Sequence, residues 1–130
     1  MRNKFNAQKV VRNGVKSASK AEYRRYQELL LLQHAGEISQ LETQVPFEII
    51  PAQYEPVARY GAQGKRLKDG KRCVEKSVVY YADFTYRNKN GEYIVEDVKG
   101  YTDSTAYRLF VIKRKLMLQV HGIRVQEIKY

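Results

Sequence analysis

The residues best suited to chemistry in this chain are Asp83, Asp97 and Lys99, which lie in two short stretches rich in valine and tyrosine. The stretches, residues 79–84 and 94–100, have the β-branched and aromatic composition of strands. Two carboxylates and an ammonium group on neighbouring strands are able to hold a divalent cation and to place a water molecule beside it. The sequence therefore predicts a metal-assisted hydrolytic site between these strands.

The turn between the strands decides whether the two aspartates meet. A two-residue loop at 90–91 would turn Asp97 to the opposite face from Asp83. A three-residue loop over 89–91, closed by a left-handed Gly91, would set Asp83 directly opposite Asp97. Because the glycine falls at the left-handed position of the longer loop, we predict that register, with the two Cβ atoms roughly 4.5–5.5 Å apart.

Side chains along a strand point alternately to its two faces. Alternation puts Lys99 on the face of Asp97 and Glu96 on the other, so Glu96 is predicted to lie outside the site. On the earlier strand, Asp83 is predicted to share its face with Tyr81. The site then consists of two opposed carboxylates with one lysine beside them.

Two bare carboxylates at this separation repel, and one of them would be driven to take up a proton. A hard cation such as Mg²⁺ removes that repulsion, and Mg²⁺ prefers one or two carboxylates together with waters and phosphate oxygens. Lys99 could then orient the attacking water or stabilise charge on a phosphate. The alternative is a structural salt-bridge cluster that Lys99 only neutralises. The apolar flanking residues disfavour this alternative, because they indicate a buried hairpin in which charged groups without a function would reduce stability.

Charge predicts the partner of such a site. The chain has 130 residues, enough for about one domain, and its 24 Lys and Arg outweigh its 14 Asp and Glu to give a net charge of +10. Nucleic acid is the favoured partner, because binding a phosphate polymer releases condensed counterions. An acidic membrane is the rival partner, but the basic residues are not gathered on one amphipathic helix.

Other features of the composition exclude whole classes of protein. No apolar run approaches the roughly 18 residues of a membrane span, and the polar, basic start lacks the apolar segment of a signal peptide. A single cysteine, Cys73, excludes an internal disulfide framework and a cysteine-based zinc site. We therefore expect no membrane partner and a reducing, cytoplasmic location.

The order of the predicted elements is α-β-β-β-α-β, an α/β fold with a small mixed sheet flanked by helices. Two capping signals bound the first helix: Ser19 with Glu22 begins it as a capping box, and Ala35-Gly36 ends it. A strand over 41–50 follows, and Pro46 indicates that part of it lies at a sheet edge or at a strand start.

The remaining segments frame these strands. Residues 1–18 are predicted to be a flexible basic arm before a domain over 19–130. Residues 51–77 lack a period and are predicted to be a long, mobile basic loop insertion. A second helix is predicted from Thr102 or Ser104 to Val120, ended by His121-Gly122, and a last strand over 123–128. The apolar stripe of the second helix is expected to face the core and contains Leu109, Ile112, Leu116 and Val120.

Asp83, followed fourteen residues later by Asp97-Val98-Lys99 within this element order, resembles the PD-(D/E)XK nuclease superfamily. Alanine stands at position 82, where the nominal proline of that pattern would be. Three further stretches, residues 19–26, 81–84 and 95–100, make the chain similar to a phage-encoded family of small Holliday-junction-resolvase-like nucleases. The resemblance implies a restriction-endonuclease-like αβββαβ core and Mg²⁺- or Mn²⁺-dependent hydrolysis of DNA in the cytoplasm of a bacterial host.

The resemblance also assigns roles. Asp83, Asp97 and Glu22 would hold the metal, with Lys99 as the fourth catalytic residue, and polar Gln44 on the first strand would approach the site. Glu22 has a second reading, because the third residue of a capping box often serves only the helix end. Its place on the inward stripe of the first helix favours the site.

The expected DNA contacts are basic residues of the loop and of the second helix. A nuclease that resolves branched DNA needs two active sites, so a homodimer is expected, whereas a non-catalytic DNA-binding protein with the same fold is the alternative function. RNA as substrate is also left open. The predicted DNA-binding residues are Lys65, Arg66, Lys68, Lys71, Arg72, Arg108, Lys113, Arg114 and Lys115.

Overall fold

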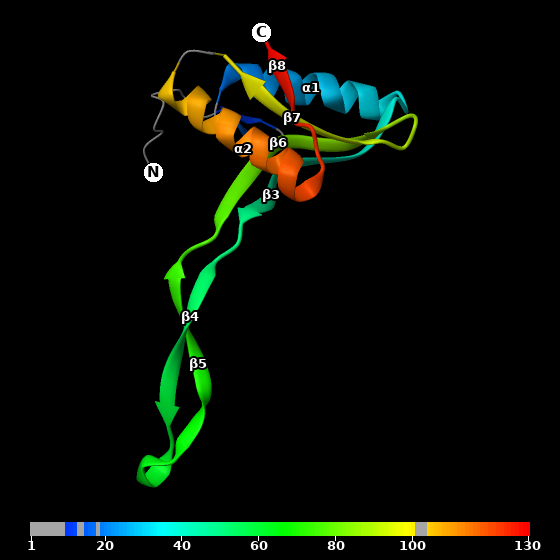
Figure 1. Ribbon diagram of the computed structural model, residues 1–130. Helices are drawn as coiled ribbons and strands as arrows, with labels where there is room; N and C mark the ends of the chain where they lie inside the picture. The colour runs from blue at the N-terminus through cyan, green and yellow to red at the C-terminus, as the bar shows by residue number, and fades with distance from the viewer. Residues whose placement is uncertain (1–9, 13–14, 18, 101–103) are drawn as a thin grey trace.

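A computed structural model shows a two-helix, mixed-sheet body from which a long two-stranded arm projects (Figure 1). The structure describes residues 10–12, 15–17, 19–100 and 104–130. Its elements are β1 (Val10–Arg12), β2 (Val15–Ser17), α1 (Lys20–His34), β3 (Ile38–Ile50), β4 (Gln53–Tyr60), a 3-10 turn (Ala62–Gly64), β5 (Arg66–Glu75), β6 (Val78–Asn88), β7 (Tyr93–Lys99), α2 (Thr105–His121) and β8 (Gln126–Lys129).

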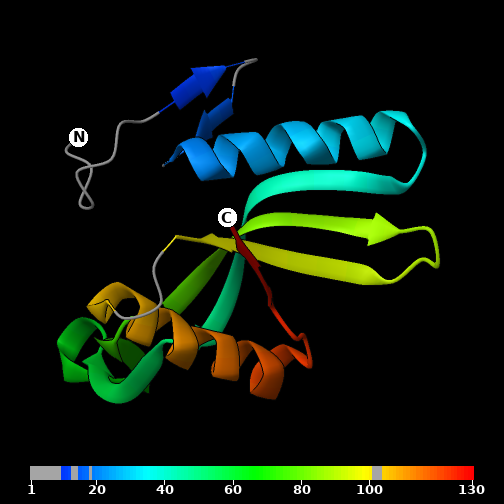
Figure 2. The ribbon, with the colours of Figure 1, turned by 90° about the horizontal axis from the view of Figure 1, so that it is seen from above.

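The body is built on a four-stranded sheet in the order β3-β6-β7-β8. β6 pairs antiparallel with both β3 and β7, whereas β8 joins the other edge of β7 in parallel. α1 and α2 lie on opposite sides of this sheet (Figure 2). The predicted mixed α/β sheet flanked by helices is therefore confirmed, as is the place of Pro46 on the edge strand β3.

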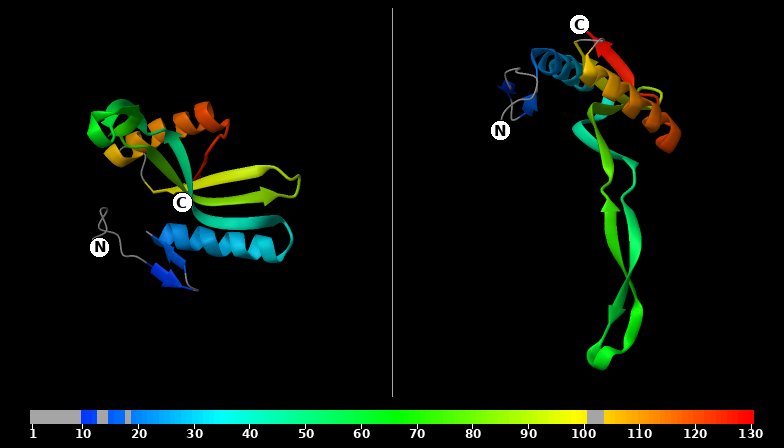
Figure 3. Two further views of the ribbon diagram at one scale, coloured as in Figure 1. Left: turned by 90° about the horizontal axis from the view of Figure 1, so that it is seen from below. Right: turned by 60° about the vertical axis from the view of Figure 1, so that its left-hand side comes forward.

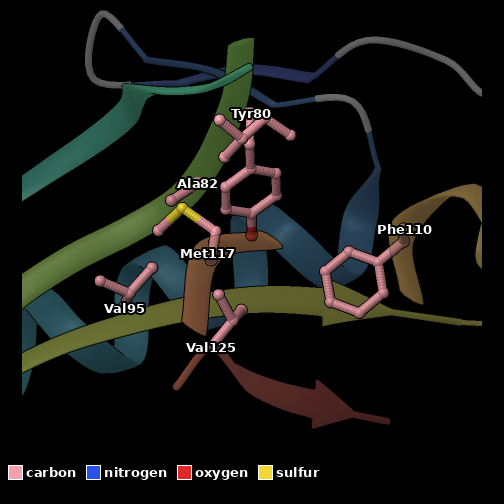
Figure 4. Packing of buried hydrophobic residues seen from close by; sticks show 7 residues of the cluster. Tyr80, Ala82, Val95, Phe110, Met117 and Val125 are labelled. Carbon is pink, nitrogen blue, oxygen red and sulfur yellow. The ribbon is translucent and has the colours of Figure 1, made fainter. Parts of the chain in front are cut away.

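Each helix covers its own hydrophobic cluster. On the α2 side, Phe110 and Met117 pack with Tyr80, Ala82 and other buried residues (Figure 4). On the α1 side, Leu29 packs against a cluster that includes Ile38, Phe84, Tyr86 and Val98. Burying apolar surface on both faces at about 25 cal/mol per Å² holds the two helices to the sheet.

The segment predicted to be a long loop is an ordered hairpin. Residues 53–60 and 66–75 form β4 and β5, which pair antiparallel with each other and extend away from the body (Figure 3). The insertion lies where the sequence places it, between β3 and β6. The prediction that it is an irregular loop is wrong. Its cross-strand backbone pairing is invisible to an apolar-period criterion, because both faces of the arm meet solvent.

Two short strands, β1 and β2, pair antiparallel within the stretch predicted to be a flexible basic arm. The remainder of that stretch, residues 1–9, 13–14 and 18, lies outside the described residues. No helix in the described part of the chain is long and apolar enough to cross a membrane.

Both helices begin and end with the capping signals predicted for them. Ser19 and Ser104 accept backbone hydrogen bonds as N-caps, while Gly36 and Gly122 adopt left-handed φ angles of 81° and 68° after the helix ends. The start at Ser104 is one of the two positions that the sequence predicts, and Thr102 lies outside the described residues.

The apolar stripe predicted for the second helix mostly faces outward. Leu109, Ile112 and Val120 are each at least half exposed, whereas Phe110 and Met117 are buried. The prediction is wrong because α2 turns its larger residues, spaced seven apart, toward the sheet. Leu116 alone of the stripe packs against the cluster beneath α2.

The turn between β6 and β7 has the predicted geometry. Gly91 has a φ of 79°, and its N–H donates to the Asn88 carbonyl at 3.0 Å. The strands on either side pair Phe84 with Glu96 and Arg87 with Tyr93. The three-residue loop and its register, which bring Asp83 and Asp97 to the same level of the sheet, are confirmed.

Gly91→Ala should destabilise the fold by about 1 kcal/mol, because a Cβ at this left-handed φ is strained although no atom lies within 4 Å of it. Gly100→Ala is the matched control, since its Cβ would also meet open space. Denaturant unfolding would measure both. An equal loss in the two variants would contradict the role of the left-handed turn.

Candidate active site

The site forms where β6 parts from β7. The pairing of the two strands stops at Phe84 and Glu96, after which β6 continues beside β3 toward the arm. Side-chain alternation breaks here: Ala82 packs under α2, yet Phe84 packs under α1. Consequently Tyr81 is 58% exposed whereas Asp83 is buried. The prediction that these two share a face is wrong, because it assumed an unbroken strand.

Asp83 occupies the gap left by the parting strands. Its Oδ2 accepts the backbone N–H of Val98 at 2.8 Å, and its Oδ1 accepts the side-chain amide of Gln44 at 3.2 Å. Gln44 has a φ of 50°, which costs a non-glycine residue about 1 kcal/mol or more. The expected approach of Gln44 to the site is therefore observed, and backbone strain accompanies it.

Asp97 is held from two directions on β7. Oδ2 accepts the Tyr80 hydroxyl at 2.6 Å, and Oδ1 lies 2.8 Å from Lys99 Nζ. The Lys99 ammonium also lies 3.9 Å from the centre of the Phe110 ring, a cation–π contact that α2 supplies. Asp97 is 5% exposed, so both carboxylates of the pair are largely withdrawn from water.

Burial and like charge act together on Asp83. Loss of solvation raises the pKa of its carboxyl to about 8, and the neighbouring carboxylates of Asp97 and Glu22 add to the rise, while the hydrogen bonds from Val98 and Gln44 oppose it. Glu22 is thus near enough to act on Asp83 electrostatically. Its backbone N–H donates to the hydroxyl of Ser19, the N-cap of α1, so the residue lies at both the helix start and the site.

Glu96, the acidic residue that alternation places outside the site, is indeed directed to the α1 side. Its carboxylate receives both Nε and Nη2 of Arg25 at 2.8 and 2.7 Å, and it also accepts the Tyr86 hydroxyl. The side chain is 1% exposed. A buried, bidentate ion pair gives Glu96 a structural role between α1 and the sheet.

The basic residues predicted to bind DNA fall into two groups. Lys65, Arg66, Lys68, Lys71 and Arg72 lie on the arm, and the others lie on α2. Three of them already have acidic partners: Arg66 pairs with Asp69, Arg72 with Glu55, and Arg114 with Glu127. Arg114 lies 2.8 Å from Glu127, which also accepts the Tyr107 hydroxyl, so this arginine joins α2 to β8.

Sequence reasoning missed Tyr80. Strict alternation from Asp83 would direct it away from the carboxylates, but the break at the strand junction returns its hydroxyl to Asp97. Burial, with the nearby charge of Asp97, raises the pKa of this phenol well above its usual value, so Tyr80 is a permanent hydrogen-bond donor. No pattern in the sequence marks the position where the side-chain alternation of β6 breaks. The break arises because β6 pairs with both β3 and β7 over only part of its length.

The described residues contain no group of three or more His, Cys, Asp or Glu side chains in metal-binding geometry. Asp83 and Asp97 nevertheless present four carboxylate oxygens, each with a lone pair beyond its present hydrogen bond or ion pair. Mg²⁺ needs only one or two carboxylates when waters and substrate oxygens complete its shell. The arrangement could therefore hold one hard cation beside Lys99.

The two buried acids should respond oppositely to neutralisation. In the unfolded chain Asp83 loses its proton near pH 4, but in the folded chain only near pH 8, so stability falls as pH rises through that window. Asp83→Asn should remove this loss and raise stability by about 2 kcal/mol at pH 8 with EDTA, with little change below about pH 4. Thermal unfolding across pH would measure the gap.

Glu96→Gln is the matched control. It should destabilise the fold by about 3 kcal/mol, because it removes the buried carboxylate that holds the partly buried Arg25 guanidinium and leaves that guanidinium only Glu28. A destabilising effect of Asp83→Asn at pH 8 would show that Asp83 is a structural acid like Glu96.

A family model matches residues 2–129. Comparison with curated proteins and with solved structures finds no match. The matching family is described as proteins of unknown function under the designation DUF1064. Since the match extends over nearly the whole chain, this protein belongs to the DUF1064 family.

Proposed function

We propose that this chain is a metal-dependent endonuclease of the PD-(D/E)XK type that hydrolyses phosphodiester bonds in DNA. One observation carries the proposal: Asp83 and Asp97 are buried together where β6 and β7 part, with Lys99 at 2.8 Å from Asp97. The element order α1-β3-β6-β7-α2-β8, with one hairpin inserted, supports a restriction-endonuclease-like core.

The residues fit a Mg²⁺ or Mn²⁺ ion. Asp83 and Asp97 offer hard oxygen ligands, and Glu22 supplies a third carboxylate nearby. When bound, such an ion would polarise the phosphate and lower the pKa of a coordinated water. Gln44 and the Val98 N–H hold the Asp83 carboxylate in place by hydrogen bonds, as the supporting shell of a metal site does.

The chain's own residues have distinct tasks in this scheme. Asp83 gives up its proton when it becomes a ligand, because its raised pKa keeps it protonated at neutral pH without a cation. Lys99 turns from Asp97 toward the substrate, where its ammonium stabilises the charge that builds on the phosphate. The Tyr80 hydroxyl holds the Asp97 carboxylate in place, and the Phe110 ring lies beneath the Lys99 ammonium.

DNA is the proposed substrate because a net charge of +10 suits a phosphate polymer. Branched DNA, two copies acting on one junction and the cytoplasm of a bacterial host follow from the resemblance to phage nucleases. The non-catalytic alternative predicts DNA binding without cleavage.

Asp97→Ala and Lys99→Met should each lower cleavage at least about a hundredfold, since each removes a group that acts on the reacting phosphate or its metal. The assay is digestion of junctions, flaps, duplexes, single strands and RNA with Mg²⁺ or Mn²⁺. Glu92→Gln is the control, an exposed acid on the same β6–β7 hairpin that should leave cleavage unchanged.

Retained cleavage in Asp97→Ala would refute the assigned site. Tight DNA binding without cleavage of any substrate, in wild type and with either metal, would instead establish the non-catalytic alternative.

Metal affinity should rise about tenfold per pH unit up to about pH 8 and then level off. Binding displaces the proton of Asp83, so protons compete with the cation below the pKa of that carboxyl. Calorimetric titration with Mn²⁺ at several pH values would measure the slope. Asp83→Asn should bind weakly with no such slope, and a wild-type affinity independent of pH between 6 and 8 would contradict the ligand role.

A further inference from the structure

The β4–β5 arm projects from the body as a free two-stranded ribbon (Figure 3). We propose that this arm is a second DNA-binding surface, which grips duplex DNA more than one helical turn away from the acidic site. The proposal rests on the proposed function in taking DNA as the partner and the acidic site as the place of cleavage. It adds a minimum length of duplex that full binding requires.

Both faces of the arm meet solvent, but the arm's own side chains cover part of one of them, here called the packed face, and leave the other open. On the packed face, the Arg59 side chain lies over Gly70, where an added Cβ would come within 2.7 Å of it, and Leu67 packs against Gly61. On the open face, β4 presents exposed Tyr54, Pro56, Ala58 and Tyr60. Opposite these residues β5 supplies Lys71, paired with Pro56, and Arg66, paired with Tyr60.

The open face thus alternates aromatic rings with cations. Tyr54 and Tyr60 are each more than half exposed, and the Arg66 guanidinium lies over Tyr60, 5.5 Å from the centre of its ring. Cations track a phosphate backbone, and exposed rings pack on sugars or bases. A two-stranded β-ribbon also has the width that the major groove of B-DNA admits.

Three lysines of the arm are available for phosphates. Lys65, Lys68 and Lys71 are exposed, and no acidic side chain among the described residues pairs with them. By contrast, Arg72 is neutralised by Glu55. The free charge of the arm is therefore concentrated on its outer part, from Lys65 to Lys71.

The arm is pre-shaped rather than an open loop. Its tip is closed by two backbone hydrogen bonds, from Gly61 to the Lys65 carbonyl at 2.7 Å and from Lys65 to the Ala62 carbonyl at 3.3 Å. A rigid element loses little conformational entropy when it binds, which favours a fixed reach over a flexible tether.

The reach follows from strand geometry. At roughly 3.3 Å per residue, the chain from Asp83 back to Lys71 spans up to about 40 Å, and back to Lys65 up to about 60 Å. One turn of B-DNA is about 34–36 Å long. When the arm follows the duplex, Lys71 meets phosphates about one turn from the bond at the acidic site, and Lys65 meets phosphates more than one turn from it.

A second copy of this chain is the rival occupant of the open face. With a net charge of +10 on each copy, a cationic ribbon meets repulsion from another copy and attraction from a polyanion. Charge complementarity therefore favours DNA.

The first test measures the salt dependence of DNA binding in EDTA, so that it does not depend on cleavage. A triple variant, Lys65→Gln with Lys68→Gln and Lys71→Gln, should bind a duplex of about 30 base pairs about 10- to 100-fold more weakly at 0.1 M salt. The slope of log K against log salt should fall by about 2.7, at about 0.9 per lost phosphate contact. Glu37→Gln with Lys89→Gln is the control, since it removes an exposed ion pair of the body without changing the net charge.

The second test shortens the duplex. A fragment of about 10 base pairs can engage the body or the arm but not both, so the advantage of wild type over the triple variant should shrink at least about fivefold from 30 to 10 base pairs. An advantage that is independent of length would overturn the long reach. An unchanged salt slope, a triple variant that shifts the oligomeric state, or an equal preference for single-stranded RNA would overturn the duplex-gripping role.

These outcomes are separable from those of the proposed function. Loss of cleavage in Asp97→Ala tests the acidic site alone, whereas the salt slope of the triple variant tests the arm alone. A chain that binds long duplexes through its arm but never cleaves them would retain the arm proposal and lose the nuclease.

Discussion

The fold depends on one strand having two sets of neighbours. β6 pairs with β7 as far as Phe84, and it stays with β3 from there toward the arm. Where it leaves β7, the Val98 N–H loses its place in the ladder, and the Asp83 carboxylate accepts it at 2.8 Å. A buried N–H without a partner would cost about 1–3 kcal/mol, so the same carboxylate both satisfies the parting strands and stands in the candidate site.

Two buried acids of the sheet, Glu96 and Asp83, have neighbours of opposite charge. On the α1 face Glu96 has a guanidinium that matches it, and the result is a stable, fully paired link between helix and sheet. Where β6 and β7 part, Asp83 has other carboxylates for neighbours, and its pKa rises. The surrounding fold holds Asp83 and Asp97 together against their mutual repulsion. Such a loss of stability is expected of a site that is preorganised to bind a cation.

The sequence predicted the features that depend on a few neighbouring residues, namely the helix caps and the turn between β6 and β7. The caps at Ser19 and Gly122 and the left-handed Gly91 were readable because each requires a particular residue at a particular backbone angle. The opposition of Asp83 and Asp97 followed from the turn by counting. Tyr80 and the outward stripe of α2 were not readable, because they depend on where a strand breaks its alternation and how a helix rotates. Both are decided by packing across the whole sheet.

The hairpin structure of the arm was not predicted for a related reason, although the arm is connected to the strands of the candidate site. A ribbon exposed on both faces has no apolar period, so residues 53–75 resemble a loop until their backbone pairing is known. Yet the arm is the continuation of β3 and β6, the strands that carry Gln44 and Asp83. Residues 51–52 and 76–77 join the two strands of the arm to this pair, so the base of the arm is tied directly to the strands of the candidate site. An arm bound to DNA would therefore restrict the direction of the duplex relative to Asp83 and Asp97, because two chain segments rather than one connect the arm to the body.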